Sequence, residues 1–372
     1  MPPKPVLQRL VHVVVLLCVA VVAAEFTARL DDWWFHKIGF WSAPSYNDLF
    51  MTDASGQRRG KPEAHYQKWQ MNSFGFRGPP IAEHPPKDVR RVMLLGASET
   101  FGLYESPQKE FAAQLAELTR SQNVEIVNAA LPGITVGTLR QYWGQWAARF
   151  GADTVIIYPS VHLYVTCEDW PAEGAAPTTD APEQHGFQIE DLRLFGRLKA
   201  VISQPDVVVA WRNGRKVEQA TARHPASWVY TSPPTACIKR LHSDLLALID
   251  DIRKSGANVI VCTQALRAAR APTPQDLRDL ESFRVFSPRA PGPIIREFVS
   301  AADADILKLP AERNVRVVDV DAVLGGRRSS FEDLVHFNDR GSETVATLLR
   351  DSLVATTARA PAGTAVTQGS QP

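Results

Sequence analysis

The chain has 372 residues, of which 45% are hydrophobic, so it can bury one large α/β core or two smaller ones. Its formal net charge of +1 predicts no strongly basic surface, and nucleic acid is therefore not an expected partner. The four cysteines, Cys18, Cys167, Cys237 and Cys262, have no metal-ligand spacing, so no metal site is expected.

The N-terminal segment is the most apolar part of the chain. Lys4 and Arg9 precede an apolar run from Leu10 to Ala24 that is broken only by His12. This run predicts a membrane segment over residues 1–26, either a cleaved signal peptide or an uncleaved signal anchor. We favour the anchor because Trp33 and Trp34 follow, and tryptophan prefers the membrane–water interface. In both cases the positive-inside rule predicts that the remainder is extracytoplasmic, and periplasmic in a Gram-negative cell.

Five short apolar segments alternate with patterns of helical period. This alternation predicts an α/β fold in three layers, α/β/α, with a five-stranded parallel sheet. The predicted strands are 92–95, 124–128, 154–158, 258–262 and 315–320. The predicted helices are 108–119, 138–150, 242–255, 293–308 and 342–354.

The remaining segments lack a clear period. We expect a membrane segment at 1–26, an N-terminal extension at 27–88, an α/β domain at 89–356 with an insertion at 166–235, and a disordered tail at 357–372. A further polar loop is expected at 268–292. Cys167 and Cys237 both lie in loop-like sequence, and the sequence leaves open whether they pair in an oxidising compartment. Cys262 lies within a predicted strand, which favours a buried free thiol.

The segment Gly96-Ala-Ser-Glu-Thr-Phe-Gly102 places a hydroxyl between a strand and a helix. Ser98 is therefore expected at the carboxyl end of a parallel strand, where open α/β sheets carry their sites. The alternative is that Ser98 is only a turn or N-cap residue. The turn contains neither Gly-x-Gly-x-x-Gly nor a P-loop lysine, which argues against a nucleotide cofactor.

A serine hydroxyl needs a neighbouring base to act as a nucleophile, and that base needs an orienting acid. Asp333 and His336 follow the fifth predicted strand, at the same sheet edge as Ser98. Three residues apart on a short turn, the carboxylate can accept the imidazole Nδ1–H and leave Nε2 for the serine. The alternative is that His336 only caps the last helix or packs under it.

Together these segments resemble the SGNH, or GDSL-type, hydrolases, including membrane-anchored bacterial members. Gly96 to Gly102 is similar to the block that carries the family nucleophile, and Asp333-Leu-Val-His336 to the block that supplies acid and base. Asn128 to Gly133 resembles the second block of the family, whose glycine N–H joins the oxyanion hole. Asn72-Ser-Phe-Gly-Phe-Arg-Gly78 is similar to a segment that precedes the domain in anchored members. The resemblance implies a flavodoxin-like SGNH fold, Ser98, Asp333 and His336 as catalytic residues, and oxyanion donors at Ser98 and Gly133.

Two segments depart from the family pattern. Ala97 stands where the family name has Asp, which is not a catalytic position. After the third predicted strand, the usual glycine is Ser160, and the usual asparagine, which donates to the oxyanion, is His162. An imidazole can also donate a hydrogen bond to an oxyanion. His162 is therefore either a substitute donor or a histidine of the rim without a role.

The resemblance implies a serine esterase that needs no cofactor and removes acyl groups, O-acetyl above all, from a small molecule or an envelope polysaccharide. Two alternatives remain open. One is an O-acyltransferase, in which a sugar hydroxyl rather than water accepts the acyl group. The other is an inactive member that binds glycan or partner proteins in envelope assembly, which the missing asparagine favours and the presence of Ser98, Asp333 and His336 opposes.

Overall fold

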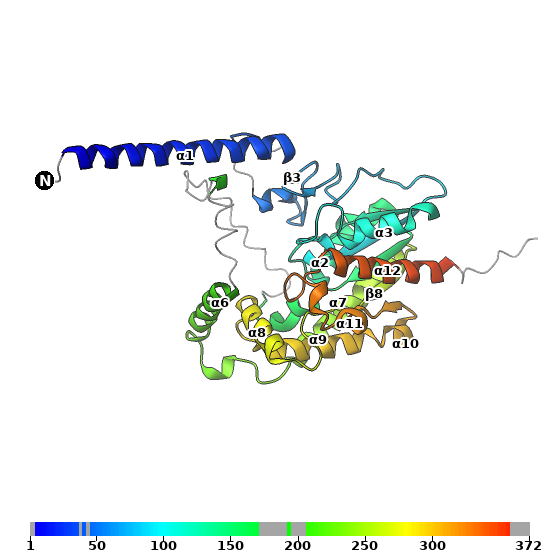
Figure 1. Cartoon of the computed structure of the whole chain (residues 1–372). Coiled ribbons are helices and arrows are strands. Elements are labelled where there is room, and N and C mark those ends of the chain that lie inside the picture. Colours follow the sequence, from blue (N-terminus) through cyan, green and yellow to red (C-terminus); the bar gives the residue numbers. More distant parts are fainter. Residues whose placement is uncertain (1–3, 37–38, 42–44, 171–191, 195–205, 358–372) are drawn as a thin grey trace, which may run out of the picture.

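A computed structural model describes residues 4–36, 39–41, 45–170, 192–194 and 206–357 (Figure 1). Two parts of the predicted insertion, 171–191 and 195–205, and the predicted tail from residue 358 onward lie outside these described residues.

The centre of the structure is a parallel sheet with the strand order β6-β5-β7-β8-β9. Its strands are β5 (Arg90–Gly96), β6 (Val124–Asn128), β7 (Thr154–Tyr158), β8 (Asn258–Cys262) and β9 (Arg316–Val318). Three of the five match the predicted limits, and the other two shift by one or two residues at their ends. The parallel five-stranded sheet predicted from the sequence is therefore confirmed.

Helices cover both faces of the sheet, because successive side chains of each strand point to opposite sides. Met93 and Leu95 of β5 pack in one core with helices α4 (Val136–Gln145), α7 (Thr235–Lys254) and α9 (Gly292–Ile306). Val92 and Leu94 pack in the other core with α3 (Phe111–Thr119) and α12 (Asp339–Thr357). Figure 1 shows α3 and α12 side by side over their face. The three-layer α/β/α architecture is thus confirmed.

Smaller elements complete the described chain. They are the strands β1 (Phe50–Thr52), β2 (Arg58–Gly60), β3 (His65–Tyr66) and β4 (Trp69–Gln70), the helices α2 (Ser98–Phe101), α6 (Asp206–Thr221), α10 (Leu309–Arg313) and α11 (Val320–Leu324), and the 3₁₀ turns η1 (Tyr46–Leu49), η2 (Arg120–Gln122), η3 (Ala147–Phe150), η4 (Val161–Asp169), η6 (Ala226–Trp228), η7 (Arg284–Phe286) and η8 (Arg328–Ser330). β1 pairs with β2 and β3 with β4, both antiparallel, within the N-terminal extension.

One segment predicted as a loop contains a helix. Within 268–292, residues Pro274–Phe283 form α8. Thr273 caps it by accepting the N–H of Asp276, whose carboxylate accepts the N–H of Thr273 in return. This capping box and the proline in the first turn outweigh the polar composition on which the loop prediction rested.

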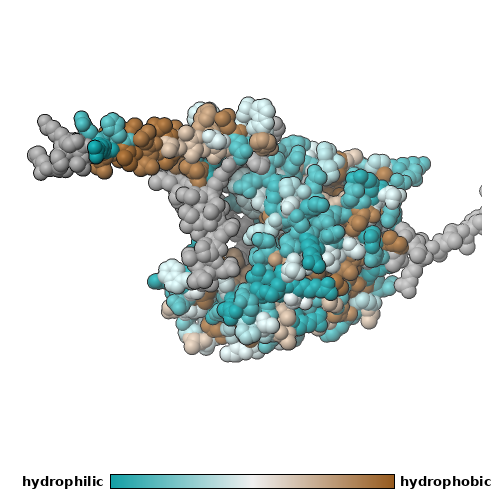
Figure 2. All heavy atoms as spheres, in the orientation of Figure 1, coloured by the Kyte–Doolittle hydropathy of each residue, from teal (hydrophilic) through white to brown (hydrophobic). Residues whose placement is uncertain are grey.

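The N-terminal helix α1 (Lys4–His36) projects from the domain (Figure 1) and continues past residue 26. It has 33 residues, so it is about 50 Å long, which exceeds the roughly 30 Å of a bilayer core. Among the described residues it is the one helix long and apolar enough to cross a membrane, and its apolar side chains are exposed (Figure 2). A membrane anchor and a signal sequence both satisfy this criterion.

Cys167 and Cys237 form a disulfide, which answers the question that the sequence leaves open. It joins η4, directly after β7, to the first turn of α7, and both cysteines are buried. Cys262 is buried and free, as predicted.

We expect the variant that carries Cys167→Ala and Cys237→Ala to lose about 2–5 kcal/mol of unfolding free energy, because a long closed loop in the unfolded chain is released. Urea unfolding of both proteins measures this difference. Dithiothreitol should lower the melting temperature of the wild type and leave that of the double variant unchanged. Equal effects of the reductant on both proteins would contradict the assignment.

Candidate active site

Ser98 lies at the carboxyl end of β5, at the first position of α2. The turn before it requires glycine, because a Cβ on Gly96 would lie 2.1 Å from Thr100 Oγ1 and 2.8 Å from the carbonyl oxygen of Tyr158. Gly102 ends the helix with a φ of +85°, a conformation that favours glycine. The two glycines thus confine Ser98 to a tight strand-to-helix turn.

Arg77 holds the other end of this helix. Its guanidinium donates hydrogen bonds to the carbonyl oxygens of Phe101 and Gly102 and forms an ion pair with Glu110 at 3.0 Å. The backbone N–H of Arg77 donates to the carbonyl oxygen of Asn128 at 3.1 Å. Arg77 and Glu110 are buried, and through these bonds Arg77 links the N-terminal extension to β6 and to the helix of Ser98. The motif that contains Arg77 is therefore part of the support of the site.

Asp333 and His336 lie on the turn between η8 and α12 and contact each other as predicted. Asp333 Oδ2 accepts from His336 Nδ1 at 2.7 Å, while Oδ1 accepts the backbone N–H groups of Val335 and His336. Nδ1 is thereby the protonated nitrogen facing the carboxylate. His336 Nε2 is buried and has no hydrogen-bond partner among the described residues.

The pKa values of this pair move apart. Burial lowers the pKa of His336, but the hydrogen bond and charge of Asp333 outweigh burial and raise it above the usual histidine value. Burial raises the pKa of Asp333, but the hydrogen bonds and charge of His336 outweigh this effect, so the pKa is lowered. The carboxylate therefore stabilises the imidazolium that forms when His336 takes a proton.

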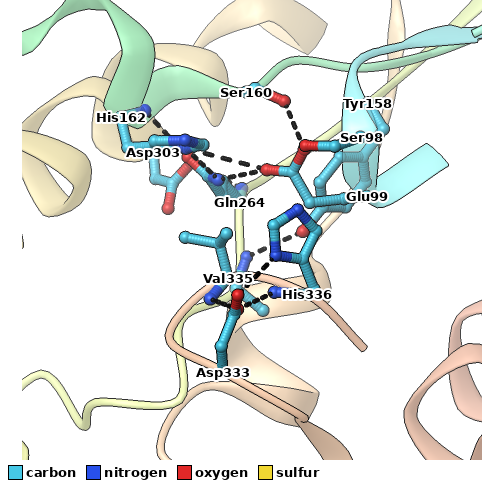
Figure 3. A network of polar contacts seen from close by, with 11 residues as sticks. Ser98, Glu99, Tyr158, Ser160, His162, Gln264, Asp303, Asp333, Val335 and His336 are labelled. Carbon is cyan, nitrogen blue, oxygen red and sulfur yellow. Dashed lines mark hydrogen bonds and ion pairs between the residues drawn. The ribbon is translucent and has the colours of Figure 1, made fainter. Parts of the chain in front are cut away.

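Ser98 Oγ donates to Glu99 Oε2 at 3.2 Å, and its predicted contact with His336 Nε2 is not made in this structure. Glu99 is only 1% exposed, and its carboxylate also accepts from Ser160 Oγ at 2.7 Å and from Gln264 Nε2 at 2.8 Å. Figure 3 shows Asp333 and His336 below this group. Close enough for its charge to act on the imidazole, Glu99 contributes to the raised pKa of His336.

His162 belongs to the same network. Its Nδ1 lies 2.7 Å from Gln264 Nε2 and 3.6 Å from Glu99 Oε1 (Figure 3). Its ring packs on that of Phe283. Burial lowers its pKa, and the charge of Glu99 does not offset this effect. The predicted donor thus lies in the network that Glu99 shares with Ser98, and its role stays a prediction.

Gly133 lies in the turn after β6 with a φ of +76° and is exposed. The N–H of Leu131 donates to the carbonyl oxygen of Gly96 at 3.0 Å, which links this turn to that of Ser98. The role of the Gly133 N–H as an oxyanion donor stays a prediction.

Glu99 and Gln264 are the site residues that the sequence analysis missed. Glu99 lies next to Ser98, and a carboxylate between a buried strand and Phe101 is costly unless it has partners. Gln264 lies two residues after β8, at the sheet edge where parallel strands place functional groups. This position directly after a predicted strand, 258–262, is the signal in the sequence that marks Gln264 as a candidate.

Among the described residues, no three His, Cys, Asp or Glu side chains gather in an arrangement that could hold a metal ion. The polar groups around Ser98 instead bond to one another.

Comparison with protein-family models and with curated proteins finds no match. Similar solved structures include a lipase/acylhydrolase from Enterococcus faecalis, with 16% identity, a TM-score of 0.41 and coverage of 72% of this chain and 97% of that one. Another is a G-D-S-L family lipolytic protein from Veillonella parvula, with 12% identity, a TM-score of 0.39 and coverage of 73% and 100%. A third is a catalytic mutant of an acetylxylan esterase from Geobacillus stearothermophilus, with 13% identity, a TM-score of 0.41 and coverage of 71% and 94%. Likeness of this degree does not establish a shared activity, so the function is inferred from the site.

We expect Arg77→Met to lower the unfolding free energy by about 3–5 kcal/mol, because it leaves the carboxylate of Glu110 buried without its partner. The same substitution at Arg120, an exposed residue paired with Glu117, is the control and should change stability little. Urea unfolding measures both. Equal losses in the two variants would show that the buried position of Arg77 is not what matters.

Proposed function

We propose that the chain is a serine esterase that removes ester-linked acyl groups through Ser98, His336 and Asp333. The observation that supports this best is the buried, unpartnered Nε2 of His336, whose other nitrogen is held by Asp333. Buried polar atoms without partners are rare in proteins and often mark sites of function. The proposal requires that the Ser98 side chain rotate to another staggered position, where Oγ exchanges its bond to Glu99 for one to Nε2.

The reaction then follows from the groups present. Ser98 Oγ attacks the ester carbonyl while its proton passes to His336 Nε2, and a tetrahedral intermediate forms. The N–H groups of Ser98 and Gly133, with His162, would stabilise the oxyanion. The carbon–oxygen bond to the leaving alkoxide breaks as His336 returns the proton to it. Water, activated by His336, then hydrolyses the acyl-serine.

The proposed substrate is an O-acyl group, O-acetyl above all, on an envelope or exported polysaccharide, met outside the cytoplasm. The apolar α1 supports a membrane anchor, and the disulfide between Cys167 and Cys237 supports an oxidising compartment. The acyl group and the acceptor rest on the resemblance of the sequence blocks.

A second candidate is an inactive member of the same fold that binds glycan or a partner protein. The observation in its favour is that Ser98 Oγ bonds to Glu99 and not to His336.

One experiment separates the two candidates. Full-length protein in detergent and its Ser98→Ala variant are treated with a fluorophosphonate probe and assayed with p-nitrophenyl acetate. We expect labelling and turnover in the wild type and neither in the variant. Labelling with little turnover would favour acyl transfer to a sugar hydroxyl. A folded wild type that neither labels nor turns over would leave the binding protein as the better proposal.

The pKa of His336 sets the expected pH dependence. The base must be neutral, and its pKa is raised by Asp333, so kcat/KM should rise with pH through a value above the usual histidine pKa of about 6.5. Asp333→Asn should move this rise of kcat/KM to lower pH and reduce the plateau value of kcat/KM by roughly 10⁴-fold. Glu332→Gln, which removes a neighbouring exposed charge, is the control. If kcat/KM of Asp333→Asn rose at the same pH as that of the wild type, the pairing of Asp333 with the catalytic base would be contradicted.

A further inference from the structure

Three buried side chains next to Ser98 form a network that the proposed triad does not use. They are Glu99, His162 and Gln264, which are 1%, 8% and 0% exposed. They come from the turn after β5, the segment after β7 and the segment after β8, three neighbouring strands of the sheet. Polar side chains are buried at such cost only when their hydrogen bonds are satisfied, and here they satisfy one another.

The orientation of the Gln264 amide follows from one contact. The backbone N–H of His162 lies 3.0 Å from the amide oxygen of Gln264. A backbone N–H can only donate, so the atom it meets must be the oxygen, and the amide cannot be reversed. The NH₂ group of Gln264 therefore points the other way, toward Glu99 Oε1 at 2.8 Å and His162 Nδ1 at 2.7 Å.

The two hydrogens of this NH₂ group have one acceptor each. One is donated to the Glu99 carboxylate and the other to Nδ1 of His162. A nitrogen that accepts a hydrogen bond carries no proton, so the proton of the neutral imidazole is on Nε2. The backbone N–H of His162 thus fixes the orientation of the Gln264 amide. That amide in turn determines the tautomer of the His162 ring.

We infer that Gln264, anchored by Glu99, is a positioning residue that holds His162 as a neutral imidazole with its proton on Nε2. In this neutral tautomer Nε2 carries the proton. Nε2–H can therefore donate a hydrogen bond to an oxyanion. The role in oxyanion binding rests on the proposed esterase, whereas the tautomer does not depend on it.

The neutral state suits the neighbouring base. The charged or titratable groups that act on His162 are Glu99, Asp333 and His336, and the backbone N–H of Gln264 is bound by the buried carboxyl of Asp303. Burial lowers the pKa of His162, so the imidazole stays neutral where His336 takes up its proton. A second positive charge near His336 would oppose the formation of its imidazolium.

The tautomer can be measured without any catalysis. Full-length Ser98→Ala protein, labelled with ¹⁵N and held in detergent, gives a long-range ¹H–¹⁵N spectrum in which the two nitrogens of each imidazole are distinguished. His162→Gln assigns the signals by their loss. We expect the Nε2–H form of His162 at neutral pH. The Nδ1–H form, or an imidazolium, in this protein would overturn the inference.

A charge change at Gln264 should switch the tautomer. Gln264→Glu replaces the donor with a carboxylate, which accepts a proton, so His162 should become the Nδ1–H form or the imidazolium. Gln275→Glu, the same substitution on the exposed surface of α8, should leave the signals unchanged. An unchanged His162 in folded Gln264→Glu protein would contradict the role of the amide. If Gln264→Glu does not fold, the measurement on the Ser98→Ala protein still decides.

The effect of Gln264 on activity, measured with and without His162, provides a second and independent readout. With p-nitrophenyl acetate, Gln264→Met should lower kcat by about 10²-fold with little change in KM, because it frees the oxyanion donor from its orientation. In a His162→Ala background the same change should cost little, because the two residues act as one unit. Equal losses in both backgrounds would show that Gln264 acts through the fold and not through His162. A wild type that is inactive in this assay counts against the esterase, while the spectrum still tests the tautomer.

Discussion

The close approach of three backbone segments at Gly96 is the constraint on which the site depends. No side chain fits there, because Thr100 and the carbonyl oxygen of Tyr158 occupy the space that a Cβ would need. The same residue accepts the N–H of Leu131, so the turns after β5 and β6 are joined at one point. Contacts of the main chain therefore position Ser98, the turn of Gly133 and the strand β7 relative to one another.

Electrostatics then divides the site into two halves. The pKa of His336 is raised and that of His162 is lowered, although both imidazoles lie at the same sheet edge. The difference lies in the partner, since His336 donates to the carboxylate of Asp333 and His162 accepts from the amide of Gln264. Histidines whose environments separate their pKa values can hold different roles at one pH, one as a proton acceptor and the other as a neutral donor.

The sheet and part of the site could be predicted from the sequence, because buried parallel strands are short apolar runs and their carboxyl ends converge. Ser98, Asp333 and His336 follow such strands, and the contact between Asp333 and His336 depends only on a local turn. The roles of Arg77 and Gln264 could not be predicted in the same way. Their partners lie far away along the chain, on Glu110 and on Glu99 and His162, and no local period encodes such pairs. The helix α8 was not predicted because its sequence is polar and contains proline, whereas the capping box at Thr273 and Asp276 that starts it is a signal of two residues only.

The disulfide has a topological consequence for the insertion. Cys167 and Cys237 lie 70 residues apart in the chain, and the bond between them closes that stretch into a covalent ring attached to the sheet. A single cut by a protease anywhere between the two cysteines would leave one covalently connected molecule, with β7 still joined to α7. The segment between them could thus be nicked, lengthened or replaced while the strands that carry Ser98, His162 and Gln264 remain linked as one covalent body.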